Sequence, residues 1–232
     1  MKALDVLSAA LFPPRCAFCG EFVLREENML CRRCAAEIEW IDSACHLCGK
    51  SVEDCTCSGR KSEYSGVVGA FYYRGIGKRS VLRLKSKPSV AKRLGYDVAG
   101  CVRAHYSDIS FDFVTSVPMW RKTQRQKGFN HSEELARRTA ENLSLPYFPV
   151  LEKIYKTEIQ HKLSYSQRNG NVKGVFSVSD ELRVRGSTIL LIDDVKTTGA
   201  TLNECSLMLN LSGAKAVYAA TAAVAYEDKN RE

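Results

Sequence analysis

The sequence has no apolar run long enough to cross a bilayer, which excludes an ordinary membrane-spanning helix. The first eleven residues, "MKALDVLSAAL", carry Asp5 inside their apolar stretch and lead into "FPPRC" without a convincing small-residue cleavage site. We interpret them as an amphipathic helix rather than a signal peptide. The expected location of the protein is therefore the cytoplasm.

Acidic residues are missing between Arg74 and Arg93, a stretch that contains eight Lys or Arg, and the chain of 232 residues has a formal net charge of +8. Such a surface favours phosphates or nucleic acid, although a solvated charged face is the alternative. A composition of 45% hydrophobic and 26% charged residues is typical of a soluble globular protein. The length accommodates one ordinary domain and a small module.

Cysteine is scarce outside residues 16–57, because only Cys101 and Cys205 lie beyond them, in helical patterns that indicate core packing. The other eight form close pairs: "CAFCG", "CRRC", "CHLCG" and "CTC". A C-x-x-C turn aims two thiolates at one ion, which favours zinc over disulfides in a chain without an export signal. A redox pair or free thiols are the alternative.

The cysteine pairs predict two zinc ions, although "CTC" has one intervening residue instead of two. Four thiolates close the coordination shell of each ion, so both ions would be structural. His46 is expected in a solvent-facing turn rather than as a ligand. The predicted ligands are Cys16, Cys19, Cys31 and Cys34 for the first ion, and Cys45, Cys48, Cys55 and Cys57 for the second.

From about Ser65 short apolar runs alternate with helical segments. Asn130 is the predicted N-cap of one helix, with Glu133 at the capping-box position. Near-continuous apolar strands joined by crossover helices predict an α/β fold with a parallel sheet and helices on both faces. We divide the chain into a cysteine-rich module, 1–60, and this domain, 61–232. The predicted strands are "GVVGAFYYRG", "FDFVTSVP", "STILLID" and "AVYAATAAVAY".

The run "ILLIDDVKTTGAT", residues 189–201, ends a predicted strand with two adjacent carboxylates. Ligands of parallel sheets bind beyond the carboxyl ends of the strands. The segment from Lys196 to Thr201 can offer backbone N–H groups, hydroxyls and a helix N-terminus to a phosphate. Asp193 and Asp194 can accept hydrogen bonds from vicinal hydroxyls or hold hydrated Mg²⁺. Together they suit a ribose 5-phosphate, and an ordinary turn with an acidic cap is the alternative.

This run resembles the phosphoribosyl pyrophosphate motif of type I phosphoribosyltransferases. The resemblance implies that the two aspartates face the ribose hydroxyls and that the Thr- and Gly-containing loop holds the 5-phosphate. Lys196 stands where an apolar or aromatic residue is expected. The implied binding residues are Asp193, Asp194, Lys196, Thr197, Thr198, Gly199, Ala200 and Thr201.

Four blocks in order resemble the ComF competence-protein family over essentially the whole chain. They are the cysteine pairs after "LFPPRC", "VPMWRKTQRQKGFNHSEELA", "KTEIQHKLSYSQRNGNVKGVF" and the ribosyl motif. Lys127 replaces the usual Arg of the second block. The resemblance implies a double zinc ribbon before a type I phosphoribosyltransferase-like domain, a role in DNA uptake, and other DNA-uptake proteins as partners.

Two sets of cations are candidates for phosphate binding. Arg83, Lys85 and Lys87 follow the first predicted strand of the larger domain, where related folds place the pyrophosphate loop, and would contact pyrophosphate and Mg²⁺. The second set is Arg121, Arg125 and Lys127, which lie near Trp120 and Phe129, while Tyr72 and Tyr73 lie near the basic run from Arg74 to Arg93. Both basic runs could therefore combine phosphate attraction with base stacking on single-stranded DNA. Solvated helix faces and core aromatics are the alternatives.

Three functions stay open at this point. The first is a ComF-type uptake factor that binds single-stranded DNA and phosphoribosyl pyrophosphate. The second is an active phosphoribosyltransferase that couples ribose 5-phosphate to a base or amine. The third is a sensor without turnover. A polar segment from Thr157 to Phe176 could close over the sugar, but it contains no clear general base, so the catalytic residues are unknown.

Overall fold

The computed structural model describes residues 14–23, 29–57, 61–154 and 174–226. The amphipathic helix predicted for the first eleven residues and nearly all of the polar segment predicted to close over the sugar lie outside these ranges. No helix in the described ranges is long and apolar enough to cross a membrane.

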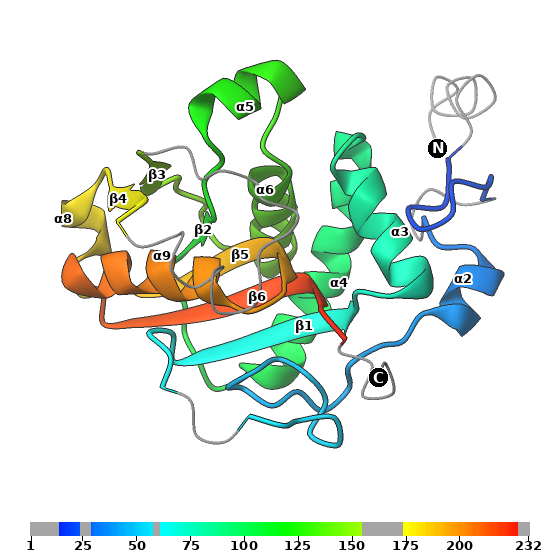
Figure 1. The fold of residues 1–232 in the computed structure, drawn as a ribbon, viewed down its shortest axis with the longest axis horizontal. Coiled ribbons are helices and arrows are strands. Elements are labelled where there is room, and N and C mark those ends of the chain that lie inside the picture. Colours follow the sequence, from blue (N-terminus) through cyan, green and yellow to red (C-terminus); the bar gives the residue numbers. More distant parts are fainter. Residues whose placement is uncertain (1–13, 24–28, 58–60, 155–173, 227–232) are drawn as a thin grey trace, which may run out of the picture.

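Four parallel strands form the central sheet, in the order β1-β6-β5-β2 (Figure 1). Their side chains are almost all buried, which explains why the sequence shows continuous apolar runs rather than alternation. The predicted α/β fold with a parallel sheet is confirmed. The strands are β1 (Gly66–Tyr72), β2 (Phe113–Ser116), β5 (Thr188–Lys196) and β6 (Ala216–Val224).

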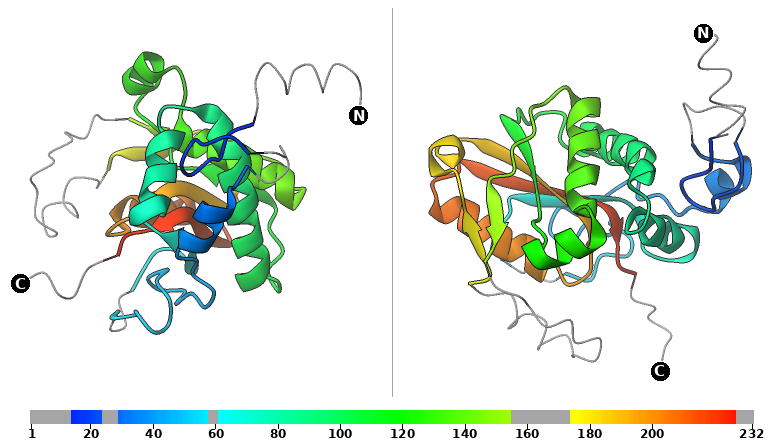
Figure 2. Two further views of the ribbon diagram at one scale, coloured as in Figure 1. Left: turned by 90° about the vertical axis from the view of Figure 1, so that its right-hand side faces the viewer. Right: turned by 90° about the horizontal axis from the view of Figure 1, so that it is seen from above.

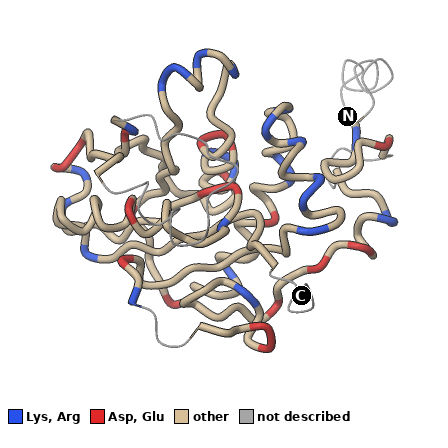
Figure 3. Tube along the Cα trace, in the orientation of Figure 1, with Lys and Arg blue, Asp and Glu red and all other residues tan. Residues whose placement is uncertain are grey.

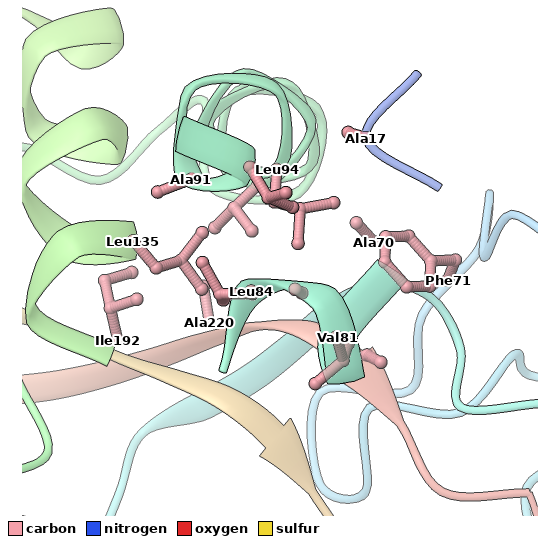
Figure 4. Close-up of a cluster of buried hydrophobic side chains, with 14 of the residues drawn as sticks. Ala17, Ala70, Phe71, Val81, Leu84, Ala91, Leu94, Leu135, Ile192 and Ala220 are labelled. Atoms are coloured by element: carbon pink, nitrogen blue, oxygen red, sulfur yellow. The ribbon is translucent and has the colours of Figure 1, made fainter. Parts of the chain in front are cut away.

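Helices cover both faces of this sheet. On one face Leu94 and Leu135, from two neighbouring helices, pack against Ile192 and Ala220 of the sheet (Figure 4). On the other face Leu202 packs in a separate cluster with Leu191 and its neighbours. The first face carries α3 (Gly75–Leu84), η1 (Pro88–Val90), α4 (Ala91–His105) and α6 (His131–Leu143), and the second carries α9 (Ala200–Leu211).

Several short elements were not predicted. A two-stranded antiparallel ribbon lies at one end of the sheet, and a helix of seven residues projects from the loop after β2 (Figure 1). Strands and helices this short carry too few residues for a clear period. These elements are α2 (Arg32–Glu37), α5 (Arg121–Lys127), β3 (Leu151–Lys153), β4 (Phe176–Val178) and α8 (Glu181–Val184).

The cysteine-rich segment lies along β1, which is an edge strand of the sheet (Figure 2). Backbone groups of β1 bond to it: Val67 N donates to His46 O at 2.7 Å, and Tyr72 N donates to Glu39 O at 3.0 Å. Phe18 is fully buried against Phe71, with ring centroids 5.5 Å apart. An uncovered edge strand would invite pairing with other chains, so the module protects β1 and shares its core.

Candidate functional site

The two carboxylates at the end of β5 are both buried, with Asp193 9% and Asp194 6% exposed. Ser132 Oγ and the backbone N–H of Asp194 each donate to Asp193 Oδ1 at 2.9 Å. Burial and the neighbouring charge of Asp194 raise the pKa of Asp193. Asp193 therefore holds a proton more readily than an exposed carboxyl group.

Asp194 is the ionised partner of the pair. Its Oδ2 forms an ion pair with Lys85 Nζ at 3.1 Å and lies 3.3 Å from His131 Nε2. Burial by itself would raise the pKa of Asp194, but His131 and Lys85 outweigh burial and lower it. The same contact raises the pKa of Lys85 although burial opposes this. One negative charge is thus already neutralised by the protein.

The loop after the carboxylates turns sharply into α9. Gly199 has φ +82°, a left-handed conformation, and is the N-cap of the helix. A β-carbon at Gly199 would lie 3.1 Å from Cε of the buried Lys196. Thr198 Oγ1 accepts from Ala200 N at 3.3 Å, whereas Thr197 is exposed. The loop therefore presents backbone at the positive end of a helix dipole, which suits an anion.

A pocket of about 230 Å³ adjoins Asp193, between α5 and the carboxyl end of the sheet. Trp120 and Met119 supply apolar surface, and Lys127, Lys153 and His131 supply nitrogen donors. Burial lowers the pKa of Lys153. The pocket therefore combines a flat aromatic wall with cations beside a carboxylate, which suits a planar or a phosphorylated ligand.

Sequence reasoning missed Ser132, His131 and Lys153 as site residues. Ser132 and His131 occupy the first turn of α6, which follows β2, the neighbour of β5 in the sheet. Because the carboxyl ends of parallel strands meet at one edge, the residues after β2 were the signal to follow. Asn130 caps α6 as predicted, accepting from Ser132 N at 3.1 Å, while Glu133 bonds to Arg137 instead of closing a capping box.

The structure places the three pyrophosphate candidates, Arg83, Lys85 and Lys87, in three different environments. Lys85 reaches Asp194, whereas Arg83 Nε donates to Ala17 O at 3.1 Å in the cysteine-rich module, and Lys87 is exposed. Of the aromatics near this run, Tyr72 is buried and its hydroxyl donates to Asp54 Oδ2 at 2.6 Å. Stacking of a base on Tyr72 is therefore excluded.

The second set gathers on α5, which projects from the molecule and is strongly basic (Figure 3). Arg125 and Lys127 are exposed, and Trp120 at its start is partly exposed. Arg121 Nη2 lies 2.8 Å from Glu152 Oε1, so part of its charge is balanced. This helix is therefore a part of the predicted nucleic-acid surface that is open to a ligand.

The eight clustered cysteines form two four-sulfur groups, and within each group the sulfur atoms lie within 4.8 Å of one another. The Cys19–Cys31 and Cys48–Cys55 sulfur pairs are each 3.7 Å apart. Tetrahedral zinc with Zn–S bonds of about 2.3 Å places sulfurs about 3.8 Å apart, so both groups fit structural zinc. The two groups are those assigned from chain order, His46 is exposed outside them, and Cys205 is buried in the core as predicted.

Comparison with known proteins finds two domains. Residues 7–66 match the double zinc ribbon domain, and residues 129–232 match the phosphoribosyl transferase domain. DNA utilization protein YhgH of Salmonella typhi is 35% identical over 107 residues, 46% of this chain and 46% of that protein. The same protein of Escherichia coli strain K12 is also 35% identical over 46% of each chain, so the chain spans about half the length of these relatives.

Competence protein F of Haemophilus influenzae is 26% identical over 220 residues, 88% of this chain and 93% of that protein. Among solved structures, a glutamine phosphoribosylpyrophosphate amidotransferase from B. subtilis is 22% identical with a TM-score of 0.39, covering 61% of this chain and 27% of that chain. Phosphoribosylpyrophosphate synthetase from Mycobacterium smegmatis is 21% identical with a TM-score of 0.35, covering 58% and 33%. Similarity to solved structures at this level has no bearing on function.

A double zinc ribbon domain followed by a phosphoribosyl transferase domain, with homologues named Competence protein F and DNA utilization protein, confirms the resemblance to the ComF family.

Proposed function

We propose that this protein binds phosphoribosyl pyrophosphate with Mg²⁺ at the carboxyl end of β5. One observation carries this proposal: the buried pair Asp193–Asp194 immediately precedes the left-handed turn at Gly199 that begins α9. The carboxylates offer acceptors to vicinal ribose hydroxyls, and the turn offers backbone N–H groups and a helix dipole to the 5-phosphate.

The pyrophosphate end of the ligand requires cations, because several negative charges separate when the C1–O bond breaks. Lys85 Nζ lies 3.1 Å from Asp194 Oδ2. We place pyrophosphate and its Mg²⁺ beside Lys85, which leaves the pocket beside Asp193 for an acceptor. Arg83 has no part in this proposal, because it is bonded to the carbonyl of Ala17.

Single-stranded DNA is the second proposed ligand, and DNA uptake is the proposed role. The named relatives are a competence protein and DNA utilization proteins. The exposed cations of α5, with Trp120 at its base, supply phosphate neutralisation and a surface for base stacking. The protein would act in the cytoplasm on incoming strands, together with other DNA-uptake proteins.

A second candidate function is an active phosphoribosyltransferase that transfers ribose 5-phosphate to a base or amine and releases pyrophosphate. The pocket lined by Trp120 and Met119 beside Asp193 favours it, because an acceptor ring would stack there close to the sugar. This feature did not follow from the sequence, which shows no nucleobase pocket.

One set of assays tests these functions. Binding of phosphoribosyl pyrophosphate with Mg²⁺ is measured by calorimetry, and pyrophosphate release is followed with a panel of bases and amines. Binding of a labelled oligonucleotide is measured in parallel at several salt concentrations. Acceptor-dependent release of pyrophosphate supports the transferase, whereas binding of both ligands without release supports the uptake factor. Loss of either binding event in these assays refutes the corresponding part of the proposal.

A further inference from the structure

Tyr64 lies between two regions: the turn of residues 45–48, which we call the knuckle, and the loop of residues 196–201, which we call the phosphate loop. Its hydroxyl donates to Leu47 O at 3.2 Å, and Leu47 stands between the ligands Cys45 and Cys48. A β-carbon placed at Gly199 would lie 3.4 Å from the same hydroxyl. Tyr64 is 8% exposed, so one buried side chain is hydrogen-bonded to the knuckle and lies beside the loop.

The residue before Tyr64 is hydrogen-bonded to α9, the helix that follows the phosphate loop. Glu63 N donates to Asn203 Oδ1 at 2.8 Å, and Asn210 Nδ2 donates to Glu63 O at 2.7 Å. The ring of Tyr64 packs in one cluster with Leu202 from the first turn of the helix. The tyrosine is therefore held by backbone and core contacts, and only its hydroxyl reaches the knuckle.

The knuckle also approaches Lys196, the first residue of the loop, through a neighbouring strand. A β-carbon at Gly49, which follows Cys48, would lie 3.3 Å from Val224 Cγ2. Val224 is the register partner of Lys196, whose carbonyl accepts from Ala225 N at 2.8 Å. The knuckle thus borders the loop at Gly199 through Tyr64 and at Lys196 through Val224.

We infer that the second zinc ribbon holds the phosphate loop in its binding conformation and that Tyr64 is the positioning residue for this. The inference rests on the proposed phosphate-binding role of the loop. A loop that is ordered before the ligand arrives binds an anion more tightly, because the cost of ordering is met during folding. The ribbon then has a role beyond stabilising its own fold: it sets the affinity of a site built by another domain.

The test is the substitution Tyr64→Phe, which keeps the buried ring and removes only the hydroxyl. Calorimetry should show phosphoribosyl pyrophosphate with Mg²⁺ binding more weakly, by up to about fivefold, because the free energy of one lost hydrogen bond is the most that this change can take from binding. The zinc content should stay unchanged. The matched control is Tyr106→Phe, because Tyr106 is equally buried and its hydroxyl donates to Ala219 O at 3.3 Å, in the sheet rather than at the loop. This control should bind as the wild type does.

Removal of the second zinc ion supplies an independent arm. The double substitution Cys55→Ser with Cys57→Ser should weaken binding in the wild-type background and cause a smaller further loss in the Tyr64→Phe background, since both act through one contact. If this variant does not fold, the two tyrosine variants decide the question alone. Equal affinity of Tyr64→Phe and wild type overturns the inference and leaves the proposed function standing. Failure of the wild type to bind overturns both.

Discussion

The cysteine groups and the Asp193–Asp194 pair both bring acidic side chains together, but the groups that surround the sulfurs differ from those that surround the carboxylates. Around the sulfurs the described contacts include backbone N–H groups, such as Cys31 N at 3.4 Å from Cys16 Sγ. Around the carboxylates the protein supplies Lys85, His131 and Ser132. Four thiolates come this close only around a metal ion that neutralises them. A buried carboxylate that is paired with a lysine is stable without a bound ligand. The first arrangement suits a permanent ion and the second an exchangeable ligand.

Removal of zinc is expected to have the largest effect. Elemental analysis should find two zinc ions per chain, and a chelator should unfold the module, because structural zinc contributes on the order of 10 kcal/mol of apparent binding free energy. The effect should spread, since Cys16, Cys34 and Phe18 belong to the same core as Phe71. Thermal denaturation with and without chelator measures it.

The two zinc sites should differ in this respect. Cys16→Ser should lower the melting temperature more than Cys57→Ser, because Cys16 is fully buried in the main core and Cys57 is partly exposed. Unchanged melting of the metal-free protein would show that the module folds without ions and would remove the contrast with the carboxylates.

Loss of the acidic pair should abolish stabilisation by the ligand. Phosphoribosyl pyrophosphate with Mg²⁺ at a hundred times its Kd should stabilise the wild type by about 2.7 kcal/mol. Asp193→Asn combined with Asp194→Asn should remove this shift, because Asp194 loses its negative charge and each side chain loses one of its two oxygen acceptors. Thermal denaturation with the ligand is the measurement. The control is Asp108→Asn, an exposed aspartate, and a shift retained in the double variant would locate the ligand elsewhere.

The unequal ionisation of the two carboxylates should appear in the stability of the ligand-free protein. The pKa of Asp193 is raised from 3.8 to about 8, so the folded state binds the proton more tightly than the unfolded state. Its contribution therefore decreases as pH rises through this window, by at most about 1.4 kcal/mol per pH unit. Asp193→Asn keeps an acceptor for Ser132 and cannot ionise, so it should gain stability over the wild type from pH 5 to pH 8.

Urea denaturation of both proteins across this pH range measures the difference between them. Asp194 has the opposite sign, because its pKa is lowered and its contribution is lost only when the pH falls below its ordinary value of 3.8. A constant difference between Asp193→Asn and wild type from pH 5 to pH 8 would show that Asp193 is already ionised in the folded protein and that its pKa is not raised into this range.

The smallest effect is expected on α5. Replacing Arg121, Arg125 and Lys127 with Ala should weaken binding of single-stranded DNA and lower the salt slope by about 0.7 for each lost phosphate contact. Arg121 should contribute least, because Glu152 balances it. The control is Arg137→Ala with Arg138→Ala on α6, whose charges pair with Glu133 and Glu141. Oligonucleotide titrations at several salt concentrations give the slopes, and equal slopes for both variants would contradict a specific role for α5.

The basic run from Arg74 to Arg93 shows where prediction from sequence ends. Its charge density indicated one phosphate-binding surface, yet Arg74 pairs with Glu39, Lys85 with Asp194, and Arg93 with Asp97. Charge counting within the run cannot separate these outcomes, because Glu39 and Asp194 are distant in sequence and Asp97 lies one helix turn beyond the run. The cations that reach the proposed site include Lys153 and His131, which belong to no basic run.

The sequence by itself determined the cysteine groups, the individual strands of the sheet and the acidic strand end, because each depends on residues close together in the chain. Thiolate pairs at knuckle spacing, continuous apolar runs and a carboxylate pair before a glycine turn are local patterns. Only the tertiary structure decided what surrounds Asp193 and Asp194 and joined Tyr64 to both the knuckle and the phosphate loop. These contacts unite segments distant in sequence, and their geometry follows from packing and strand order, which no local pattern encodes.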